Sequence, residues 1–288
     1  MTDFVGQVKY RNGVAVILVN WRTADMTLRA VKNVFCQSSP PEHVFVVDNG
    51  SGDGSVEVLR EALGLMLERT TLVVNNDNRG FGGGCNPAIT AALADGYRYV
   101  WLLNNDAVPE STCLAALLHT AQAADQPVGA VGSLLVDTTG LHKPHYGSWM
   151  RPGALTCGNV EQPDDLDRGF AWCTAASLLL DCSAISVVGG FDEAFFMYWE
   201  DADLNMRLRN AGFALLCAPN ARVTHDAGTS SANIPVQRYL WHFDSQRHFL
   251  KKHHKFPAIA RKMLRCKFLL KALYDRDTSR FRALLARR

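Results

Sequence analysis

A run of five apolar residues that stops at three polar ones constrains the fold of this chain more than any other stretch. Residues 99–103 are too few for a typical helix, and their unbroken apolar character is typical of a strand buried on both faces. Asn104, Asn105 and Asp106 follow directly, and Pro109 stands where a helix is expected to begin. The polar trio is expected at the carboxyl edge of an α/β sheet, where ligands gather, or alternatively as a turn and helix cap.

The same pattern of a short strand followed by a polar loop occurs three more times upstream. Apolar strands are expected at residues 14–19, 44–47 and 71–75, with helices between them. The helix after the third strand is expected to begin at Asn86 and Pro87. Alternating strands and helices predict a mostly parallel sheet with right-handed crossovers. The loops then share one edge, and the residues expected to face one cleft there are Asn20, Asp48, Asn78 and Asp106.

The second half of the chain is less regular. Residues 137–169 show no period, and a long segment of this kind in a compact domain is often a binding loop. Residues 170–180 are expected to form one buried strand, and residues 200–211 a helix. Asp201 shares a face of that helix with Leu204, so its carboxylate is expected to point toward the protein body at the mouth of the cleft.

The composition is that of an ordinary globular protein. Of the 288 residues, 48% are hydrophobic and 20% are charged, which allows a large core and argues against disorder. None of the eight cysteines forms a Cys-x-x-Cys pair, so reduced core thiols in a cytoplasmic protein are expected rather than a zinc site or disulfide framework. No secretory signal is visible, and the longest apolar stretch falls well short of the roughly 20 residues of a membrane helix.

The C-terminal part of the chain carries a different charge from the rest. From Arg247 onward there are fourteen Lys or Arg and two acidic residues, a net charge of +12, which leaves −10 for the remainder of a chain whose total is +2. We therefore expect a main α/β domain at residues 1–233 and a basic helical extension at residues 234–288.

After Pro257 the extension is expected to form an amphipathic helix. Its apolar positions follow helical spacing and are Ile259, Met263, Cys266, Leu270 and Leu273. Such a helix, with Lys and Arg on its other faces, can lie on an anionic membrane surface or pack on the main domain, and the sequence leaves both open. Nucleic acid is not an expected partner, because no RNA- or DNA-binding motif accompanies the charge.

The glycine-rich loop after the third strand does not match two common nucleotide-binding motifs. The dinucleotide fingerprint needs Gly-x-Gly-x-x-Gly on the first strand–helix turn, whereas Gly80 and Gly82 are followed at the third position by Cys85. There is no Gly-x-x-x-x-Gly-Lys-Ser/Thr sequence, and no phosphate loop with Lys or Arg follows the first strand. A dehydrogenase, a P-loop ATPase and a nucleotidyltransferase are therefore disfavoured.

Taken together, the motifs of this chain resemble those of the inverting nucleotide-sugar glycosyltransferases of family 2, which have the GT-A fold. The motifs are Val19-Asn20-Trp21, Val46-Val47-Asp48-Asn49-Gly50-Ser51, Asn78-Arg79-Gly80-Phe81-Gly82-Gly83-Gly84-Cys85-Asn86, Leu102-Leu103-Asn104-Asn105-Asp106, Gly190-Phe191-Asp192-Glu193 with Glu200-Asp201-Ala202-Asp203-Leu204, and Val223-Thr224-His225. The sequences of these motifs are similar to those of bacterial rhamnosyl- and galactofuranosyltransferases that build cell-surface polysaccharides. The resemblance implies a mixed, mostly parallel sheet flanked by helices.

The resemblance also implies a divalent cation, Mg2+ or Mn2+, which offsets the negative charge of a departing diphosphate. Asp106 matches the last acid of the family's Asp-x-Asp motif, and His225 matches a histidine that completes the coordination. A histidine taken by itself would more often be packed or exposed. Asn104 stands in place of the motif's first acid and is expected near the ribose, which leaves the identity of the metal open.

A nucleotide-sugar site follows from the same resemblance. The residues expected to bind the nucleotide sugar are Asn20, Asp48, Asn78, Arg79, Gly82, Gly83, Asn104 and Asn105. Asp48 matches the acid that binds the nucleobase, although it is also a typical turn former before Gly50. The expected donor is a dTDP- or UDP-linked sugar, with rhamnose or galactofuranose foremost. The expected acceptor is a hydroxyl of a glycan or a lipid-linked glycan.

Inverting transfer needs a base on the face opposite the leaving group, and the resemblance gives that role to Asp201. Trp199 and Glu200 are expected beside it on the acceptor side, with Trp199 either stacked on a sugar ring or part of the core. Acids at this position can alternatively complement the positive end of a helix, an effect of only ~0.3–1 kcal/mol.

The resulting expectation is a cytoplasmic glycosyltransferase that is peripheral on the inner face of the plasma membrane. The alternative is a catalytically silent GT-A domain that binds nucleotide sugar or acts as a scaffold for other enzymes. The presence together of Asp48, Asp106, Asp201 and His225 favours the enzyme.

Overall fold

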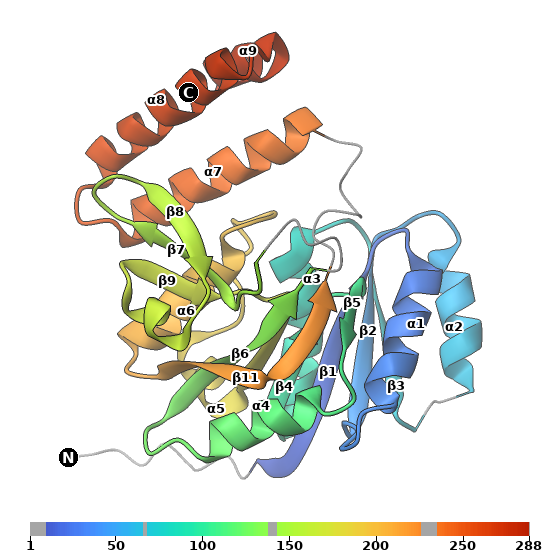
Figure 1. Ribbon diagram of the computed structural model, residues 1–288. Coiled ribbons are helices and arrows are strands. Elements are labelled where there is room, and N and C mark those ends of the chain that lie inside the picture. Colours follow the sequence, from blue (N-terminus) through green and yellow to red (C-terminus); the bar gives the residue numbers. More distant parts are fainter. Residues whose placement is uncertain (1–9, 66–67, 138–142, 226–234, 288) are drawn as a thin grey trace, which may run out of the picture.

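The computed structural model describes residues 10–65, 68–137, 143–225 and 235–287 and has three layers, a central sheet with helices on both faces (Figure 1). Within these ranges, eight strands form the central sheet in the order β3-β2-β1-β4-β10-β6-β11-β5. Most neighbouring strands are parallel, and β10 and β5 pair antiparallel with their neighbours. The expected α/β fold with a mixed, mostly parallel sheet is confirmed.

One half of the sheet consists of parallel strands joined by helices. The strands are β1 (Arg11–Asn20), β2 (His43–Asn49), β3 (Thr70–Asn75) and β4 (Tyr97–Leu103), and the helices are α1 (Ala24–Phe35), α2 (Ser55–Gly64) and α3 (Gly80–Ala94). The strands expected at residues 14–19, 44–47, 71–75 and 99–103 lie within these observed strands. Their carboxyl ends share one edge of the sheet, as expected.

The other half of the sheet mixes strand directions and carries a smaller sheet. The remaining central strands are β5 (Ala107–Pro109), β6 (Val128–Val136), β10 (Ser177–Asp181) and β11 (Ala214–His225), and the helices around them are α4 (Cys113–Gln122), α5 (Cys182–Val188) and α6 (Glu200–Asn210). The smaller sheet has the order β8-β7-β9 and consists of β7 (Gly147–Arg151), β8 (Thr156–Val160) and β9 (Phe170–Cys173), with the 3-10 helix η1 (Pro163–Asp167) beside it. The described part of the long segment without a period therefore contains two antiparallel strands of this small sheet and the 3-10 helix.

Alternate residues of β1 point into two separate cores, which explains its unbroken apolar sequence. Ala15 and Ile17 belong to the core under α3, α5 and α6. Val14, Val16 and Leu18 belong to the core under α1, α2 and α4. Because both faces of a strand between two helical layers are buried, every position must be apolar until the chain reaches the edge of the sheet.

Two expected helix starts are wrong, and contacts with distant segments explain both. Pro109 ends the edge strand β5, where its missing N–H costs no ladder hydrogen bond, and α4 begins only at Cys113. Helix α3 begins at Gly80 and contains Pro87. Asn86 does not cap it, because its side chain accepts a hydrogen bond from the backbone N–H of Phe191 and donates one to the carbonyl of the same residue.

The single strand expected at residues 170–180 is in fact two strands in different sheets. Strand β9 belongs to the smaller sheet and β10 to the central one, and residues 174–176 form the turn between them. The apolar run continues across the turn because Ala175 and Ala176 are themselves buried. Burial on both sides of a turn removes the polar residues that would mark it in the sequence.

The C-terminal segment forms three helices that pack against the smaller sheet. They are α7 (Pro235–His253), α8 (Pro257–Tyr274) and α9 (Thr278–Ala286). Met150 of β7 and Leu155 of the β7–β8 turn share a third core with Phe243 and Phe249 of α7 and Leu264 of α8. Among the described residues, no helix combines the length and the apolarity needed to cross a lipid bilayer.

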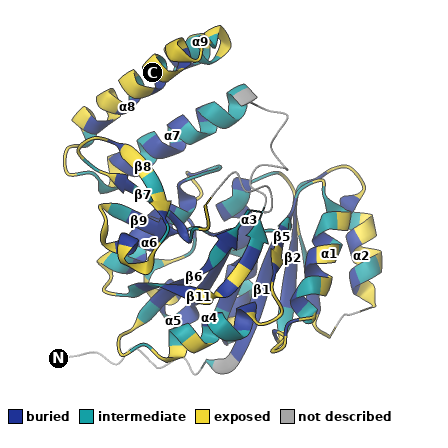
Figure 2. Ribbon diagram, viewed as in Figure 1, coloured by how far each residue is buried: buried dark blue, intermediate teal, exposed yellow. Residues whose placement is uncertain are grey.

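Helix α8 has two apolar faces, and the one expected from the sequence points outward (Figure 2). Side chains buried against α7 and α9 recur every four residues and are Ala260, Leu264, Phe268 and Ala272. On the opposite face, Ile259, Leu270 and Leu273 are 60%, 66% and 55% exposed. The interpretation in which this expected stripe packs on the main domain is therefore wrong, since the stripe is exposed and a second stripe of small and aromatic side chains packs against α7 and α9.

Gly80→Ala is expected to destabilise the protein far more than Gly52→Ala. Both glycines have positive φ angles, +72° and +62°, which an alanine adopts only with strain. A Cβ at Gly80 would also lie 1.8 Å from the carbonyl oxygen of Phe196, whereas nothing lies within 4 Å of one at Gly52. We expect losses in unfolding free energy of about 2–4 kcal/mol and about 1 kcal/mol respectively, measured by urea unfolding. Equal losses would show that the contact with Phe196 does not constrain the start of α3.

Candidate active site

A cavity of about 490 Å³ lies where the carboxyl ends of the central strands face the smaller sheet and α7. The lining from the strand-end loops is Val19, Trp21, Thr23, Asn49, Asn78, Gly80, Phe81, Asn104, Asn105, Asp106 and His225, with Thr174, Ala175 and Ala176 from the β9–β10 turn. The rest is His145, Ser148, Cys157 and Trp172 from the small-sheet region, Met197 to Asp201 before and within α6, and Arg238, Trp241 and His242 from α7. The cavity is therefore assembled from segments spread over the whole chain.

Asp106 and His225 meet at one wall of the cavity although 119 positions separate them in the sequence. Antiparallel pairing of β5 with β11 sets His225 opposite Ala107, so the imidazole Nε2 lies 3.2 Å from Asp106 Oδ1. The side-chain amide of Asn104 lies 3.3 Å from the same nitrogen. The side chains of Asp106 and His225 are 11% and 12% exposed. The pair is thus nearly enclosed but borders the cavity.

A carboxylate and an imidazole at this separation fit a divalent cation as two of its ligands. The described residues contain no group of three or more His, Cys, Asp or Glu that could hold a metal ion. A cation held by Asp106 and His225 therefore needs its other ligands from water or from the oxygens of a bound anion. This donor set is suited to a metal that binds together with a diphosphate.

Asn105 connects the polar trio to the first helix. Its side-chain amide donates hydrogen bonds to the hydroxyls of Thr23 and Thr27, each at 2.8 Å. Thr23 stands at the N-cap of α1, but its side chain makes no cap hydrogen bond. Its hydroxyl instead donates to the side-chain oxygen of Asn20. The polar trio therefore forms part of a hydrogen-bonded edge between strands and is more than a turn.

Asp201 lies in the first turn of α6 with its carboxylate at the cavity. Backbone N–H groups of Ala202 and Ala175 donate to its two oxygens at 2.8 Å and 3.3 Å. Ala175 belongs to the turn that interrupts the expected strand, so the break between β9 and β10 supplies a donor to this carboxylate. Burial raises the pKa of Asp201 despite these hydrogen bonds, which makes it a stronger proton acceptor than an exposed aspartate.

Glu200 is the buried neighbour of this acid. Burial, with the nearby charge of Asp201 as a further cause, raises the pKa of Glu200 to about 8. One of its carboxyl oxygens, Oε2, is buried without a hydrogen-bond partner among the described residues. At neutral pH the two adjacent carboxyl groups therefore share a proton, because burial disfavours two neighbouring negative charges.

The residues just before these two acids have strained backbone. Tyr198 and Trp199 have φ angles of +70° and +69°, a conformation that bulky side chains seldom adopt. Trp199 is 4% exposed and lies about 5.0 Å, ring to ring, from both Trp172 and Phe249. Trp199 is therefore mainly a core residue with one edge at the cavity. Its packing holds the strained turn that presents Asp201.

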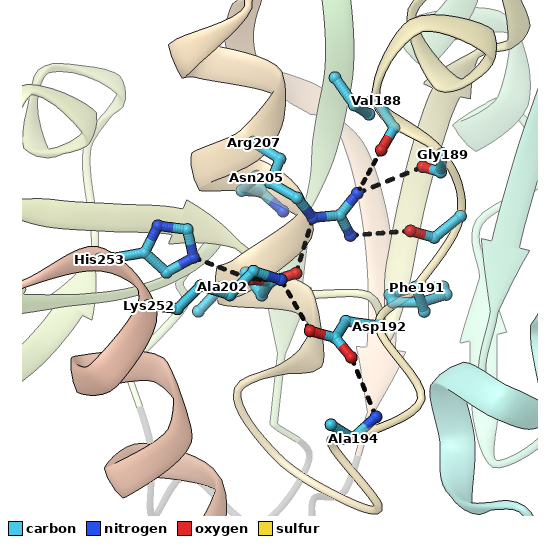
Figure 3. Close-up of polar contacts among 12 residues, drawn as sticks. Val188, Gly189, Phe191, Asp192, Ala194, Ala202, Asn205, Arg207, Lys252 and His253 are labelled. Atoms are coloured by element: carbon cyan, nitrogen blue, oxygen red, sulfur yellow. Dashed lines mark hydrogen bonds and ion pairs between the residues drawn. The ribbon is translucent and has the colours of Figure 1, made fainter.

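A buried ion cluster joins α6 to α7 (Figure 3). The fully buried carboxylate of Asp203 pairs with Arg207 of its own helix and with Lys252 and His253 of α7, at 2.7, 2.7 and 2.8 Å. Lys252 also bridges to Asp192 at 2.7 Å. Burial alone would raise the pKa of Asp203, but the hydrogen bonds of His253 and Lys252 and the charge of Arg207 hold it well below its usual range. The helix that carries Asp201 and the helix that closes the cavity are thereby fixed to each other.

The structure brings most of the expected site residues to one cavity. Those that line it are Asn78, Asn104, Asn105, Asp106, Trp199, Glu200, Asp201 and His225. Those that do not line it are Asn20, Asp48, Arg79, Gly82 and Gly83. The two acids and the histidine on which the expected chemistry depends therefore surround the same hollow.

The residues outside the lining have visible structural contacts. Asp48 is fully buried and accepts hydrogen bonds from the side chains of Asn20 and Ser51 at 2.7 Å and 2.6 Å. Arg79 forms an ion pair with Glu193. The glycines at 82 and 83 pack closely at the start of α3, where a Cβ at Gly82 would lie 2.7 Å from the side chain of Phe191. The expected role of Asp48 at the nucleobase stays a prediction.

Sequence reasoning did not identify the contribution of α7. Arg238, Trp241 and His242 line the cavity from the segment that was expected to be a separate basic extension. The irregular segment suspected of being a binding loop does reach the cavity, through His145, Ser148 and Cys157. The high positive charge of the C-terminal segment suggested a solvated helix. The spacing of these α7 residues gives no signal that distinguishes a helix face lining a cavity from one facing solvent.

Comparison with known proteins identifies the kind of chain this is. The family model for glycosyl transferase family 2 matches residues 15–174. The N-acetylglucosaminyl-diphospho-decaprenol L-rhamnosyltransferase of Mycobacterium tuberculosis strain H37Rv is 28% identical over 264 residues, covering 83% of this chain and 84% of the relative. Rhamnosyltransferase WbbL of Escherichia coli K12 is 33% identical over 187 residues, covering 60% and 70%. Galactofuranosyltransferase GlfT1 of the same mycobacterial strain is 26% identical, covering 75% and 71%.

Solved structures share the fold at low sequence identity. Mannosyltransferase PcManGT from Pyrobaculum calidifontis, in complex with GDP-Man and Mn2+, has a TM-score of 0.58 at 18% identity, covering 99% of this chain and 81% of that one. S. aureus TarS 1–349 in complex with UDP has a TM-score of 0.55 at 13% identity, covering 91% and 72%. The likeness confirms the expected GT-A fold.

Glu200→Gln is expected to remove a pH dependence of stability. Between pH 4.5, the ordinary glutamic acid pKa, and about 8, the folded state holds a proton that the unfolded state has lost, so wild-type stability falls as the pH rises through this window. Glutamine cannot titrate, so the unfolding free energy of the variant minus that of wild type should rise from pH 5 to pH 9, by about 1–4 kcal/mol. Unfolding curves across this range measure it. A difference that stays constant with pH would contradict a protonated, buried Glu200.

Proposed function

The chain belongs to glycosyl transferase family 2, and from this premise we propose that it is an inverting, metal-assisted glycosyltransferase with Asp201 as its general base. The observation that carries the proposal is that Asp106, His225 and Asp201 line one cavity. Inverting transfer requires a group that holds the departing diphosphate and a base that reaches the attacking hydroxyl in the same cavity, since the acceptor must attack opposite the departing group.

The proposed donor is a dTDP- or UDP-linked sugar, with rhamnose or galactofuranose as the transferred group. Support comes from relatives that are named rhamnosyltransferase and galactofuranosyltransferase. The proposed acceptor is a hydroxyl of a glycan or lipid-linked glycan, and the rhamnosyltransferase relative is named for a diphospho-decaprenol acceptor.

The negatively charged diphosphate of the departing nucleotide would lie beside Asp106 and His225. Asp106 and His225 would hold a divalent cation there, which would offset the negative charge of the diphosphate as the bond between sugar and phosphate breaks. Asn104 contributes an amide where an acid would add negative charge, so the protein ligands carry one full charge, that of Asp106. Mg2+ and Mn2+ are the proposed ions, and Mn2+ is the ion in the PcManGT complex.

Asp201 would take the proton from the acceptor hydroxyl as that oxygen attacks the sugar. Hydrogen bonds from the backbone of Ala175 and Ala202 fix the orientation of its carboxylate. The raised pKa of Glu200 limits the negative charge that this neighbour places beside Asp201. A base whose pKa is raised toward neutrality accepts a proton more readily during the attack.

The outward stripe of α8 supports a location on an anionic membrane surface. Ile259, Met263, Leu270 and Leu273 are exposed on the face opposite the packed one, and Tyr274 beside them is 87% exposed. The rest of this segment is rich in exposed cations, which include Arg261 and Lys262. Apolar side chains that enter the headgroup region beside cations match the chemistry of an anionic bilayer. We place the protein at the inner face of the plasma membrane, as a peripheral cytoplasmic enzyme.

The chemical roles predict two different defects. Asp201→Asn should keep nucleotide-sugar binding and lower the turnover number by roughly 10²- to 10⁴-fold, because an amide cannot accept the proton. Asp106→Ala should instead lose the part of nucleotide binding that depends on added Mn2+. Calorimetry with UDP, dTDP and their sugars, with and without Mn2+, measures binding, and product analysis measures transfer.

The same measurements separate the enzyme from a silent domain. Wild-type protein that binds a nucleotide sugar and transfers nothing to any glycan or lipid-linked acceptor would support a binding or scaffolding role. Full turnover in Asp201→Asn would remove Asp201 from the role of base. Nucleotide affinity that is independent of Mn2+ would remove Asp106 and His225 from the role of metal ligands.

The full-length chain is expected to cosediment with vesicles that contain phosphatidylglycerol and not with pure phosphatidylcholine. The double variant Ile259→Gln, Leu270→Gln should weaken this binding by roughly tenfold or more, because two apolar side chains no longer enter the bilayer. Leu65→Gln is the matched control, since Leu65 is 91% exposed and lies outside the stripe. Dimers in light scattering that dissociate in the double variant, without vesicle binding, would show that the stripe contacts a second copy instead.

A further inference from the structure

The cavity is rich in acidic groups, and one basic side chain stands out in its lining. Asp106, Glu200 and Asp201 supply three carboxyl groups. Among the described residues that line the cavity, Arg238 is the single Lys or Arg. A diphosphate entering this hollow brings two or more negative charges, so its position will be set by whatever cations it meets.

The side chain of Arg238 is held at one end and available at the other. Its Nε donates a hydrogen bond of 2.8 Å to the hydroxyl of Tyr198. No carboxylate in the described part of the chain forms an ion pair with Arg238, which distinguishes it from Arg79, Arg207 and Arg222. The two terminal amino groups of a guanidinium form a planar fork that matches two oxygens of a phosphate. The bond through Nε leaves this fork for a ligand.

The place of Arg238 on its helix adds to its positive potential. It is the fourth residue of α7, a helix of 19 residues with no acidic residue in its first turn. The N-terminal end of a helix carries a partial positive charge. The arginine and the helix end therefore both attract an anion in the cavity.

Helix α7 is fixed relative to the proposed base. Lys252 and His253 of α7 bind the buried carboxylate of Asp203, two residues after Asp201 on α6 (Figure 3). The hydroxyl of Ser245 donates to the carbonyl of Met197, at 2.8 Å, in the segment that leads into α6. These contacts fix the position of Arg238 on α7 relative to the carboxylate of Asp201 on α6.

We propose that Arg238 binds a diphosphate in the cavity, so that the C-terminal helical segment completes the substrate site of the main domain. The proposal rests on the proposed glycosyl transfer, in which a diphosphate has two sources. One is the leaving group of the nucleotide-sugar donor, and the other is the diphosphate of a lipid-linked acceptor. Arg238 lies outside the residues that match the family model, so this is a contribution that the matched core of the chain does not contain.

The test compares Arg238→Gln with Lys251→Gln in the full-length chain. Lys251 is an exposed cation of the same helix, and it does not line the cavity. Calorimetry with UDP, dTDP and inorganic pyrophosphate, against uridine and thymidine, isolates the contribution of the diphosphate. Loss of charge-assisted hydrogen bonds should weaken diphosphate and pyrophosphate binding by roughly 10- to 100-fold in Arg238→Gln, while the Lys251 variant stays within about twofold of wild type.

Two further variants keep the result interpretable. Arg238→Lys retains the charge without the planar fork and should lie between wild type and Arg238→Gln, and it replaces the glutamine variant if that one fails to fold. Tyr198→Phe removes the partner of Nε and should weaken diphosphate binding less than Arg238→Gln does. Equal effects of Tyr198→Phe and Arg238→Gln on thermal stability, with diphosphate affinity unchanged in both, would show a purely structural contact and overturn the proposal.

The remaining outcomes distinguish the two sources. Weaker UDP or dTDP binding in Arg238→Gln assigns the site to the donor. Unchanged nucleotide affinity with a raised KM for a diphosphate-linked acceptor assigns it to the acceptor, and no change in either overturns the proposal. Wild-type protein that binds no nucleoside diphosphate counts against the proposed glycosyl transfer, and the pyrophosphate measurement then decides the role of Arg238 by itself.

Discussion

The geometry of the cavity depends on the ion pairs that the buried carboxylate of Asp203 forms with α6 and α7. A carboxylate with no solvent exposure is strongly unfavourable unless cations and hydrogen-bond donors surround it. Arg207, Lys252 and His253 do so, and two of these come from α7. Because the cluster is costly to separate, α6 and α7 keep one relative position. The cavity wall of α7 and the acid at the start of α6 are therefore parts of one rigid arrangement.

In this arrangement the charged and titratable side chains of the cavity come from different walls. Asp106 and His225 form one pair at the end of the central sheet, and Asp201 with Glu200 forms another at the start of α6. Arg238 supplies a permanent positive charge from α7. The proposed transfer from a nucleotide-diphosphate sugar needs positive charge near the departing group and a base near the attacking one, and residues suited to both roles line this cavity. The C-terminal helical segment therefore supplies both this arginine, from α7, and the outward apolar face of α8.

Local patterns predicted much of the fold and failed where distant contacts decided the structure. The four parallel strands and the helix at residues 200–211 follow from hydrophobic periodicity and stop signals, which act over a few neighbouring residues. The start of α3 at Gly80 depends on the carbonyl of Phe196, more than one hundred residues away. The break between β9 and β10 has no polar marker because its alanines are buried. Likewise, α8 has two apolar stripes, and its sequence does not say which one packs.

The sequence by itself determined the α/β fold, the polar edge at the ends of its strands and the family motifs that contain Asp106, Asp201 and His225. Each of these is written in short stretches, because burial and turn formation depend on neighbouring residues. Only the tertiary structure decided which polar side chains reach the cavity, so that Asp48 is enclosed by Asn20 and Ser51 while Arg238 is not paired with an acid among the described residues. Hydrogen bonds and ion pairs between segments far apart in the chain make that choice, and their partners have no fixed spacing in the sequence.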